Sequence, residues 1–187
     1  MVTIRRAGPS DANAMARVHL ASWRNTYAGV LPDSFLANLS VTRESVGYEL
    51  GLIERRGGHA GFVAVADGSE TPGGGIVGFA TGGLARRSGL ADGEVETLYV
   101  LDDFRDRGIG RRLLRGMASH LCSLGARSAF AWVLEQNASR FFYERLGARM
   151  VAQEPIRYAG TSLTQRAYAW NPIHKLLTAT ASNRQPR

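Results

Sequence analysis

The first third of the chain carries apolar residues at the spacing of α-helices. After a short run at residues 3–6 that predicts a strand, Ala14, Val18 and Ala21 recur at intervals of three or four residues. This period places apolar side chains on one face of a helix. Two further helices are expected, one starting near Pro32 and one over residues 42–56.

The pattern changes after residue 60, where apolar residues come in short runs separated by Gly-rich and polar segments. Such runs are typical of strands joined by turns. Between two of the later runs, Leu113, Met117 and Leu121 form one stripe and predict an amphipathic helix. In order, we expect strands at 61–67, 74–84 and 93–101, a helix at 110–125, a strand at 128–134, a helix at 137–147, and strands at 148–153 and 162–170.

This order of elements indicates an α/β fold. A meander of three strands that passes through a helix into another strand forms a mixed, mostly antiparallel sheet, which helices must cover. The whole pattern fits one domain over residues 1–170. Residues 171–187 are expected to form a polar C-terminal tail, interrupted only by the apolar run IHKLL.

Composition narrows the class of protein. Apolar residues make up 44% of the 187 and charged residues 21%, as in an ordinary globular domain. No apolar run approaches the ~18–20 residues that span a bilayer. The chain shows no signal-peptide core, and with Cys122 as its single cysteine it has no internal disulfide, so we expect a cytoplasmic protein without a membrane partner.

The formal net charge is +7, and nearly all of the positive charge is arginine, since Lys175 is the only lysine. Arginine suits phosphate groups, but such an excess also arises from compositional bias. Nucleic-acid binding is one hypothesis, motivated by charge alone. We do not expect it, because the chain has no basic stripe interleaved with aromatic residues. The four histidines lie without ligand spacing, so no metal site is predicted.

The stretch DDFRDRGIGRRLL, residues 102–114, sets Gly108 and Gly110 among arginines where the amphipathic helix begins. The first N–H groups of a helix lack intrahelical partners, and glycine lets backbone approach a ligand closely. Together these features favour an anion, with phosphate as the natural one. The alternative is a simple turn before a surface helix whose arginines are solvated. Four arginines flank the glycines: Arg105, Arg107, Arg111 and Arg112.

Two motifs together resemble the GNAT superfamily of N-acetyltransferases. In GEVETLYVLDDFRDRGIGRRLL, residues 93–114, Arg105, Gly108 and Gly110 match the R/Q-x-x-G-x-G/A signature of its acetyl-CoA segment. The second motif is LEQNASRFFYERLG, in which the matching residues are Asn137, Phe142, Tyr143, Glu144 and Gly147, with Ala148 where an aromatic residue is usual. The resemblance covers residues 3 to about 170.

The resemblance implies acetyl-CoA as cofactor and a splay between the fourth and fifth strands. The backbone at Leu98 to Val100 would pair with the pantetheine arm, while backbone N–H groups of 107–110 and Arg105 would hold the pyrophosphate. Asn137 would bind pantetheine or cap its helix. The candidate cofactor-binding residues are Leu98, Tyr99, Val100, Arg105, Asp106, Arg107, Gly108, Ile109, Gly110, Arg111, Asn137, Phe142 and Tyr143.

The implied reaction is acyl transfer to a primary amine of a small molecule or peptide N-terminus. Tyr143 is the candidate general acid, with a core aromatic as the alternative. Strand alternation puts Glu94 and Glu96 on the side of Leu98 and Val100. Glu94 is the candidate base and Glu96 the second choice, because the resemblance implies a glutamate eleven residues before Arg105, where Glu94 stands. The candidate substrate-binding residues, each of which is alternatively a core aromatic, are Trp23, Tyr27, Phe35 and Tyr158.

A second hypothesis is a module of the same fold that senses acyl-CoA without turning it over. It predicts tight binding and no transfer. Dimers are common in the family, so a homodimer is one option for assembly. The sequence names neither the acceptor amine nor the base.

Overall fold

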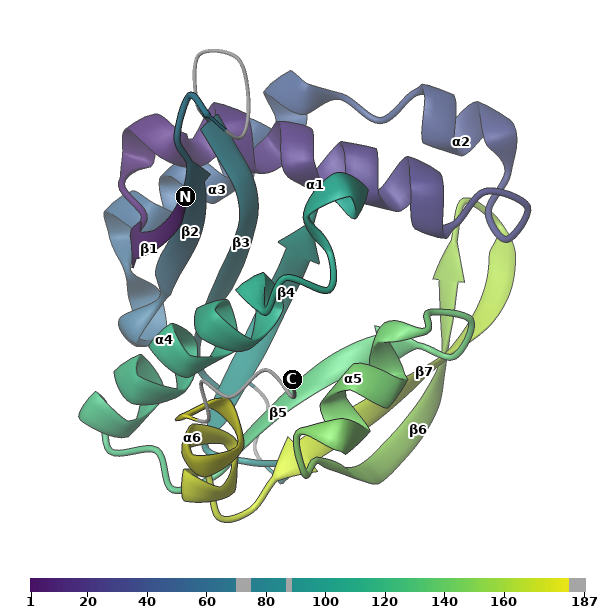
Figure 1. Cartoon of the computed structure of the whole chain (residues 1–187). Helices are drawn as coiled ribbons and strands as arrows, with labels where there is room; N and C mark the ends of the chain where they lie inside the picture. The colour runs from purple at the N-terminus through teal and green to yellow at the C-terminus, as the bar shows by residue number, and fades with distance from the viewer. Residues whose placement is uncertain (70–74, 87–88, 182–187) are drawn as a thin grey trace.

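The computed structural model describes residues 1–69, 75–86 and 89–181. Its sheet has seven strands in the order β1-β2-β3-β4-β5-β7-β6. Residue 74, the expected start of one strand, and residues 182–187 of the tail lie outside the described residues. The elements, drawn in Figure 1, are β1 Val2–Arg6, η1 Pro9–Asp11, α1 Ala12–Thr26, α2 Asp33–Ala37, α3 Val41–Glu54, η2 Arg56–Gly58, β2 Ala60–Ala66, β3 Gly75–Leu84, β4 Gly93–Val100, η3 Asp102–Phe104, α4 Ile109–Ser123, β5 Ala129–Leu134, α5 Ser139–Arg145, β6 Arg149–Tyr158, β7 Thr161–Trp170 and α6 His174–Ala181.

Helices cover both faces of the sheet. Figure 1 shows α4 in front of β2 to β4, with α3 behind them. Alternate residues of β2 and β3 supply the two cores: Ala64 and Ala80 pack towards Leu113 of α4, while Val63 and Phe79 pack towards α1 and α3. The predicted mixed α/β fold is therefore confirmed, and the Leu113–Met117–Leu121 stripe is fully buried as the apolar pattern requires.

The strands β4 and β5 form the parallel pair of the sheet. Their pairing is short, with Gly93 opposite Ala129 and Glu94 opposite Phe130. Every other pairing among the seven strands is antiparallel. Beyond Glu94 the two strands diverge, and Figure 1 shows the open angle between them. The expected splay between the fourth and fifth strands is thus present. It leaves one side of β4 without a neighbouring strand.

The packed part of the chain continues past residue 170. The apolar run that interrupts the polar tail forms α6, whose Leu176 is fully buried. Ile173 and Leu176 join the core between α4 and the strands, together with Trp170. A helix so buried is part of the fold, because its apolar side chains leave water only by packing there.

Candidate functional site

A cavity of about 160 Å³ lies where β4 and β5 part. Its walls come from the end of α1, from β4 and β5 beyond their last paired residues, from α5 and from the β6–β7 hairpin. Large aromatic residues dominate it, and four of them are tyrosines. The described residues that line it are Trp23, Tyr27, Val95, Glu96, Thr97, Leu98, Tyr99, Trp132, Val133, Leu134, Asn137, Ser139, Tyr143, Tyr158 and Gln165.

Three of the four predicted substrate residues therefore meet in this cavity. Trp23 stands at the centre of the group, with the ring centroids of Tyr27 at 5.0 Å and of Tyr158 at 5.4 Å. Phe35 is not among the described lining residues. Its ring lies behind Trp23, at 6.4 Å between centroids, in the cluster formed by α2 and the β6–β7 hairpin.

Tyr99 and Tyr27 are each held by a nitrogen donor. The indole Nε1–H of Trp23 donates to the Tyr99 hydroxyl at 2.8 Å, and the Nδ2 amide of Asn137 donates to the Tyr27 hydroxyl at 2.9 Å. Asn137 also accepts from the backbone N–H of Ser139 at 2.8 Å. Asn137 is not the N-cap that the alternative interpretation expects, because Ala138 takes that position without a side-chain cap. Its bond to Ser139 instead closes a turn just before α5, and its side chain lines the cavity.

Tyr143 enters the cavity from α5. Its ring meets Trp170 edge-on, with 5.6 Å between centroids, and the side chain is nearly buried. Burial raises the pKa of Tyr143, with a smaller contribution from Tyr27. The hydroxyl is therefore protonated at neutral pH. The structure gives it no hydrogen-bond partner among the described residues, so it can donate to a bound molecule.

Glu96 lines the cavity, but its carboxylate is already engaged. Its Oε1 lies 3.0 Å from Arg86 Nη2 and its Oε2 lies 3.2 Å from His59 Nδ1. Burial alone would raise the pKa of Glu96, but His59 and Arg86 outweigh it and the pKa is lowered. A carboxylate with two cationic or donor partners is a weak proton acceptor.

The expected facing of the two glutamates is wrong. A β-bulge opposite Thr81 and Gly82 inserts Glu96 as an extra residue in β4. The bulge shifts by one residue the alternation of side chains between the two faces of the sheet. Val95 and Leu98, three residues apart, therefore both pack on the α4 side. Glu96 instead contacts His59, whose ring lies against α3 on the opposite face.

Glu94 lies where β4 still has two neighbours, opposite Gly83 on β3 and Phe130 on β5. It is not among the described residues that line the cavity. Because Val95 packs towards α4, Glu94 points to the other face. Its role as a base stays a prediction.

The start of α4 has the backbone that the glycine motif predicts. Gly108 caps the helix with φ of +71°, and Asp106 also has a positive φ of +59°. A Cβ on Gly108 would meet no protein atom within 4 Å, so this position is open towards solvent. At Gly110 an added Cβ would lie 3.4 Å from Phe142 Cζ, an ordinary van der Waals distance, so the Phe142 ring lies beside this turn. Ile109 is buried, so only its backbone is available to a ligand.

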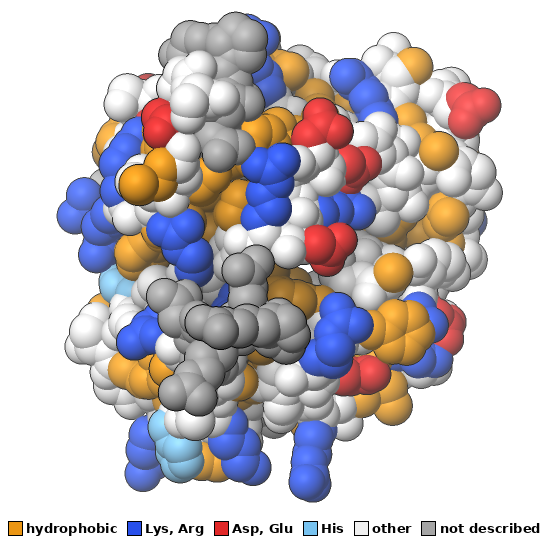
Figure 2. All heavy atoms as spheres, in the orientation of Figure 1, with side chains coloured by type: hydrophobic (Ala, Val, Ile, Leu, Met, Phe, Trp, Pro, Cys, Tyr) orange, Lys and Arg blue, Asp and Glu red, His pale blue; other side chains and the backbone are white. Residues whose placement is uncertain are grey.

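Several of the arginines around these glycines have partners in the protein. Arg105 pairs with Asp102 at 2.8 Å, Arg107 lies over the Phe104 ring at 4.9 Å, and Arg112 donates to the Val2 carbonyl at 2.9 Å. Arg105 remains half exposed. Figure 2 shows Lys and Arg side chains spread over the face that carries α4 and α5, with Asp and Glu side chains among them.

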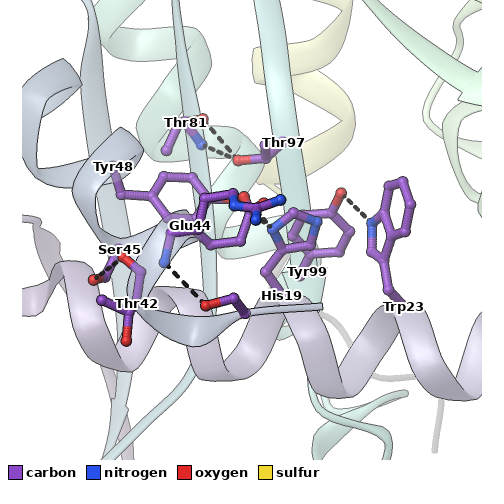
Figure 3. A network of polar contacts seen from close by, with 11 residues as sticks. His19, Trp23, Thr42, Glu44, Ser45, Tyr48, Thr81, Thr97 and Tyr99 are labelled. Atoms are coloured by element: carbon purple, nitrogen blue, oxygen red, sulfur yellow. Dashed lines mark hydrogen bonds and ion pairs between the residues drawn. The ribbon is translucent and has the colours of Figure 1, made fainter. Parts of the chain in front are cut away.

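Sequence reasoning missed a partly buried polar cluster behind Tyr99. The His19 ring is stacked on the Tyr99 ring at 4.7 Å, and His19 Nδ1 lies 3.1 Å from the Tyr48 hydroxyl and 3.5 Å from Glu44 Oε2 (Figure 3). Burial lowers the pKa of His19 to about 4, so the imidazole is neutral at pH 7. No motif marks these residues, because they meet only when α1, α3 and β4 pack together.

Neither a metal site nor a membrane-spanning helix is found in the described ranges. No three His, Cys, Asp or Glu side chains gather there as metal ligands, and none of the helices there is long and apolar enough to cross a bilayer.

Comparison with known proteins places the chain in a family. The model described as the acetyltransferase (GNAT) family matches residues 21–148. The chain is also 32% identical over 179 residues to an uncharacterized N-acetyltransferase, YuaI, of Bacillus subtilis, covering 95% of this chain and 98% of that protein. The chain therefore belongs to the GNAT acetyltransferase family, which makes it an acyltransferase by descent and confirms the resemblance of the two motifs.

Solved structures share the fold. PaiA N-acetyltransferase from Thermoplasma acidophilum, in complex with coenzyme A, superimposes with a TM-score of 0.66 at 19% identity, over 89% of this chain and 98% of that one. YncA from Salmonella typhimurium, with its cofactor acetyl-CoA, gives 0.63 at 21% identity, over 91% and 93%.

The neutral His19 predicts a specific acid sensitivity. In the unfolded chain this imidazole takes up a proton near pH 6.5, whereas in the folded protein it does so only near pH 4. The free energy of unfolding should therefore fall as pH drops through this window, by about 3 kcal/mol at most. His19→Phe, which keeps an aromatic ring on Tyr99, should flatten this slope in denaturant titrations between pH 4 and 6.5.

Tyr48→Phe is the matched control for this effect. It removes the hydroxyl partner but leaves the imidazole buried, so the slope should persist. An unchanged slope in His19→Phe would show that other groups cause the acid sensitivity.

Proposed function

We propose that the protein transfers an acetyl group from acetyl-CoA to a primary amine. The observation that carries the proposal is the junction of two features. The Phe142 ring lies beside Gly110 at the start of α4, where an added Cβ would be 3.4 Å from its Cζ, and the adjacent Tyr143 lines the cavity at the splay. The start of α4, which we propose binds phosphate, and the proton donor Tyr143 thus lie close together, joined by Phe142.

The residues present fit acetyl-CoA. The start of α4 offers backbone N–H groups without intrahelical partners, and the open space at Gly108 lets a pyrophosphate approach them. Arg105, half exposed beside this turn, adds positive charge. The unpaired side of β4 at Leu98 to Val100 can bond an extended chain such as pantetheine, as a sheet edge bonds an added strand.

Acetyl-CoA supplies an activated acetyl thioester. The amine nitrogen forms the new C–N bond, the C–S bond breaks, the amine loses a proton and the sulfur gains one. Tyr143, protonated at neutral pH, is placed to donate that proton. We assign to backbone N–H near Val100 the stabilisation of the developing charge on the carbonyl oxygen.

The described lining residues offer the amine no strong base to take its proton. Glu96 is held by His59 and Arg86, so it accepts a proton weakly. Glu94 is not among the described lining residues, so a role as base requires an intervening water. The positions of the two glutamates therefore favour an acetyl acceptor whose amine is already partly unprotonated at neutral pH.

The same observation also keeps a second function open. A sensor that binds acyl-CoA without transfer would use α4 and β4 in the same way and would need no base. Thiol release from acetyl-CoA with a panel of amines separates the two: amine-dependent release supports the enzyme, and tight binding without release supports the sensor.

Tyr143→Phe tests the proton donor. We expect kcat to fall by about 10²- to 10⁴-fold, because a general acid contributes a factor of that order, while KM for acetyl-CoA changes little. Steady-state thiol release measures both constants. Tyr168→Phe is the control, since Tyr168 is a buried neighbour whose ring centroid lies 6.5 Å from that of Tyr143 and which is not among the described lining residues. Undiminished turnover in Tyr143→Phe would remove the assignment.

Gly108→Val tests the phosphate site. A branched side chain should block the backbone N–H groups, and we expect the Kd for coenzyme A, measured by calorimetry, to rise more than about tenfold, as one lost charge-assisted contact implies.

The matched control is Gly125→Val at the other end of α4. Gly125 also has a positive φ, +87°, and open space around its Cβ position. Both variants pay the same backbone strain, so only the loss of a ligand contact distinguishes them. Equal coenzyme A affinity in the two would argue against a phosphate at Gly108.

A further inference from the structure

The geometry of two tyrosines defines what the cavity can bind. An indole N–H and an amide NH₂ are donors only, so the oxygens of Tyr99 and Tyr27 act as acceptors towards Trp23 and Asn137. The orientation of the Asn137 amide is fixed, because its Oδ1 accepts from the Ser139 N–H.

Each of the two tyrosine hydroxyls can therefore still donate its own proton to another acceptor. The structure gives neither Tyr99 nor Tyr27 any acceptor for its proton among the described residues. A buried phenol normally finds such a partner. Both side chains line the cavity, so the partner they can serve is a molecule bound there.

The charges around the cavity restrict that partner further. Among the described lining residues there is no Lys, Arg or His, and the one charged residue is Glu96. Arg86 is already paired with Glu96, so a ligand carboxylate would be buried beside Glu96 without a cation of its own among the described lining residues, which is strongly disfavoured. The hydrogen-bond acceptor that the two tyrosines recognise should therefore be a neutral oxygen, such as an amide carbonyl.

The amine itself is restricted by the weak base. An α-amine beside a carbonyl has a pKa of about 7.7–8.0, against about 10.4 for an alkylamine such as that of lysine. At neutral pH a useful fraction of the α-amine is already unprotonated. An α-amine next to a neutral carbonyl thus offers an acceptor to the two tyrosine hydroxyls, and it needs no strong base, which the described lining residues do not supply.

Building on the proposed function, we propose that the acceptor is an α-amino amide, in which the amine lies one carbon from a neutral carbonyl that accepts from Tyr99 and Tyr27. Peptide N-termini and small amino acid amides both have this chemistry. Free amino acids and plain alkylamines, including polyamines, lack it.

Three matched amines test the proposal: alanine amide, alanine and isopropylamine. They share the branched carbon and differ in carrying a neutral carbonyl, a carboxylate or neither. We expect kcat/KM for alanine amide to exceed both others by at least about tenfold, when expressed per unprotonated amine. A tripeptide amide beginning with alanine separates the two sources, since a higher kcat/KM than alanine amide indicates a peptide.

Tyr99→Phe should reduce the ratio of alanine amide to isopropylamine about tenfold. The pKa values of the amines cancel in this comparison of ratios. Tyr48→Phe is the matched control, because Tyr48 lies in the same aromatic cluster but is not among the described lining residues, and its ratio should stay unchanged. If Tyr99→Phe does not fold, as judged by circular dichroism, Tyr27→Phe gives the same test.

Two failures can be told apart. If the wild-type protein acetylates alanine or isopropylamine as well as alanine amide, or if Tyr99→Phe and Tyr27→Phe keep the wild-type ratio, the acceptor class is wrong and acetyl transfer stands. If no amine releases thiol although coenzyme A binds, the proposed function itself fails.

Discussion

The brief parallel pairing of β4 and β5 is the constraint on which the site depends. Two residue pairs hold the strands together, at Gly93 and Glu94, and then the strands diverge. A sheet that kept pairing would bury the edge of β4 and close the cavity. The divergence is supported from both sides, since α4 packs on β4 while α5 and the β6–β7 hairpin follow β5. The fold therefore carries unpaired backbone at its centre.

Aromatic packing converts this opening into a selective cavity. Trp23 joins α1 to β4 through Tyr99, and Asn137 joins the start of α5 to Tyr27. These contacts fix α1, β4 and the start of α5 around one space. They use both phenol oxygens as acceptors and leave the hydroxyl protons available. Glu96, the one carboxylate among the described lining residues, pairs with Arg86 and lies against His59. The walls thus supply neutral donors, and this sets the chemistry that the cavity accepts.

Much of the fold could be predicted from the sequence, because it follows from local periodicity. Leu113, Met117 and Leu121 form the buried face of α4, as their spacing predicts, and Asn137 and Tyr143 of the second motif line the cavity. The facing of Glu96 could not be predicted, since a bulge shifts alternation without a sequence signal in β4. His19 was missed for a different reason: its partners come from α3 and β4, and only tertiary packing brings them together.

The central claim is that acetyl-CoA lies along the open side of β4 and ends at α4. Amide hydrogen exchange with and without saturating coenzyme A measures this directly, because a strand edge gains protection only where a partner bonds it. The account predicts slower exchange at residues 98–100 and 107–111, with no change along β1 and β6 at the two outer edges of the sheet. Protection confined to those outer strands, or none at β4 under saturating ligand, would contradict it.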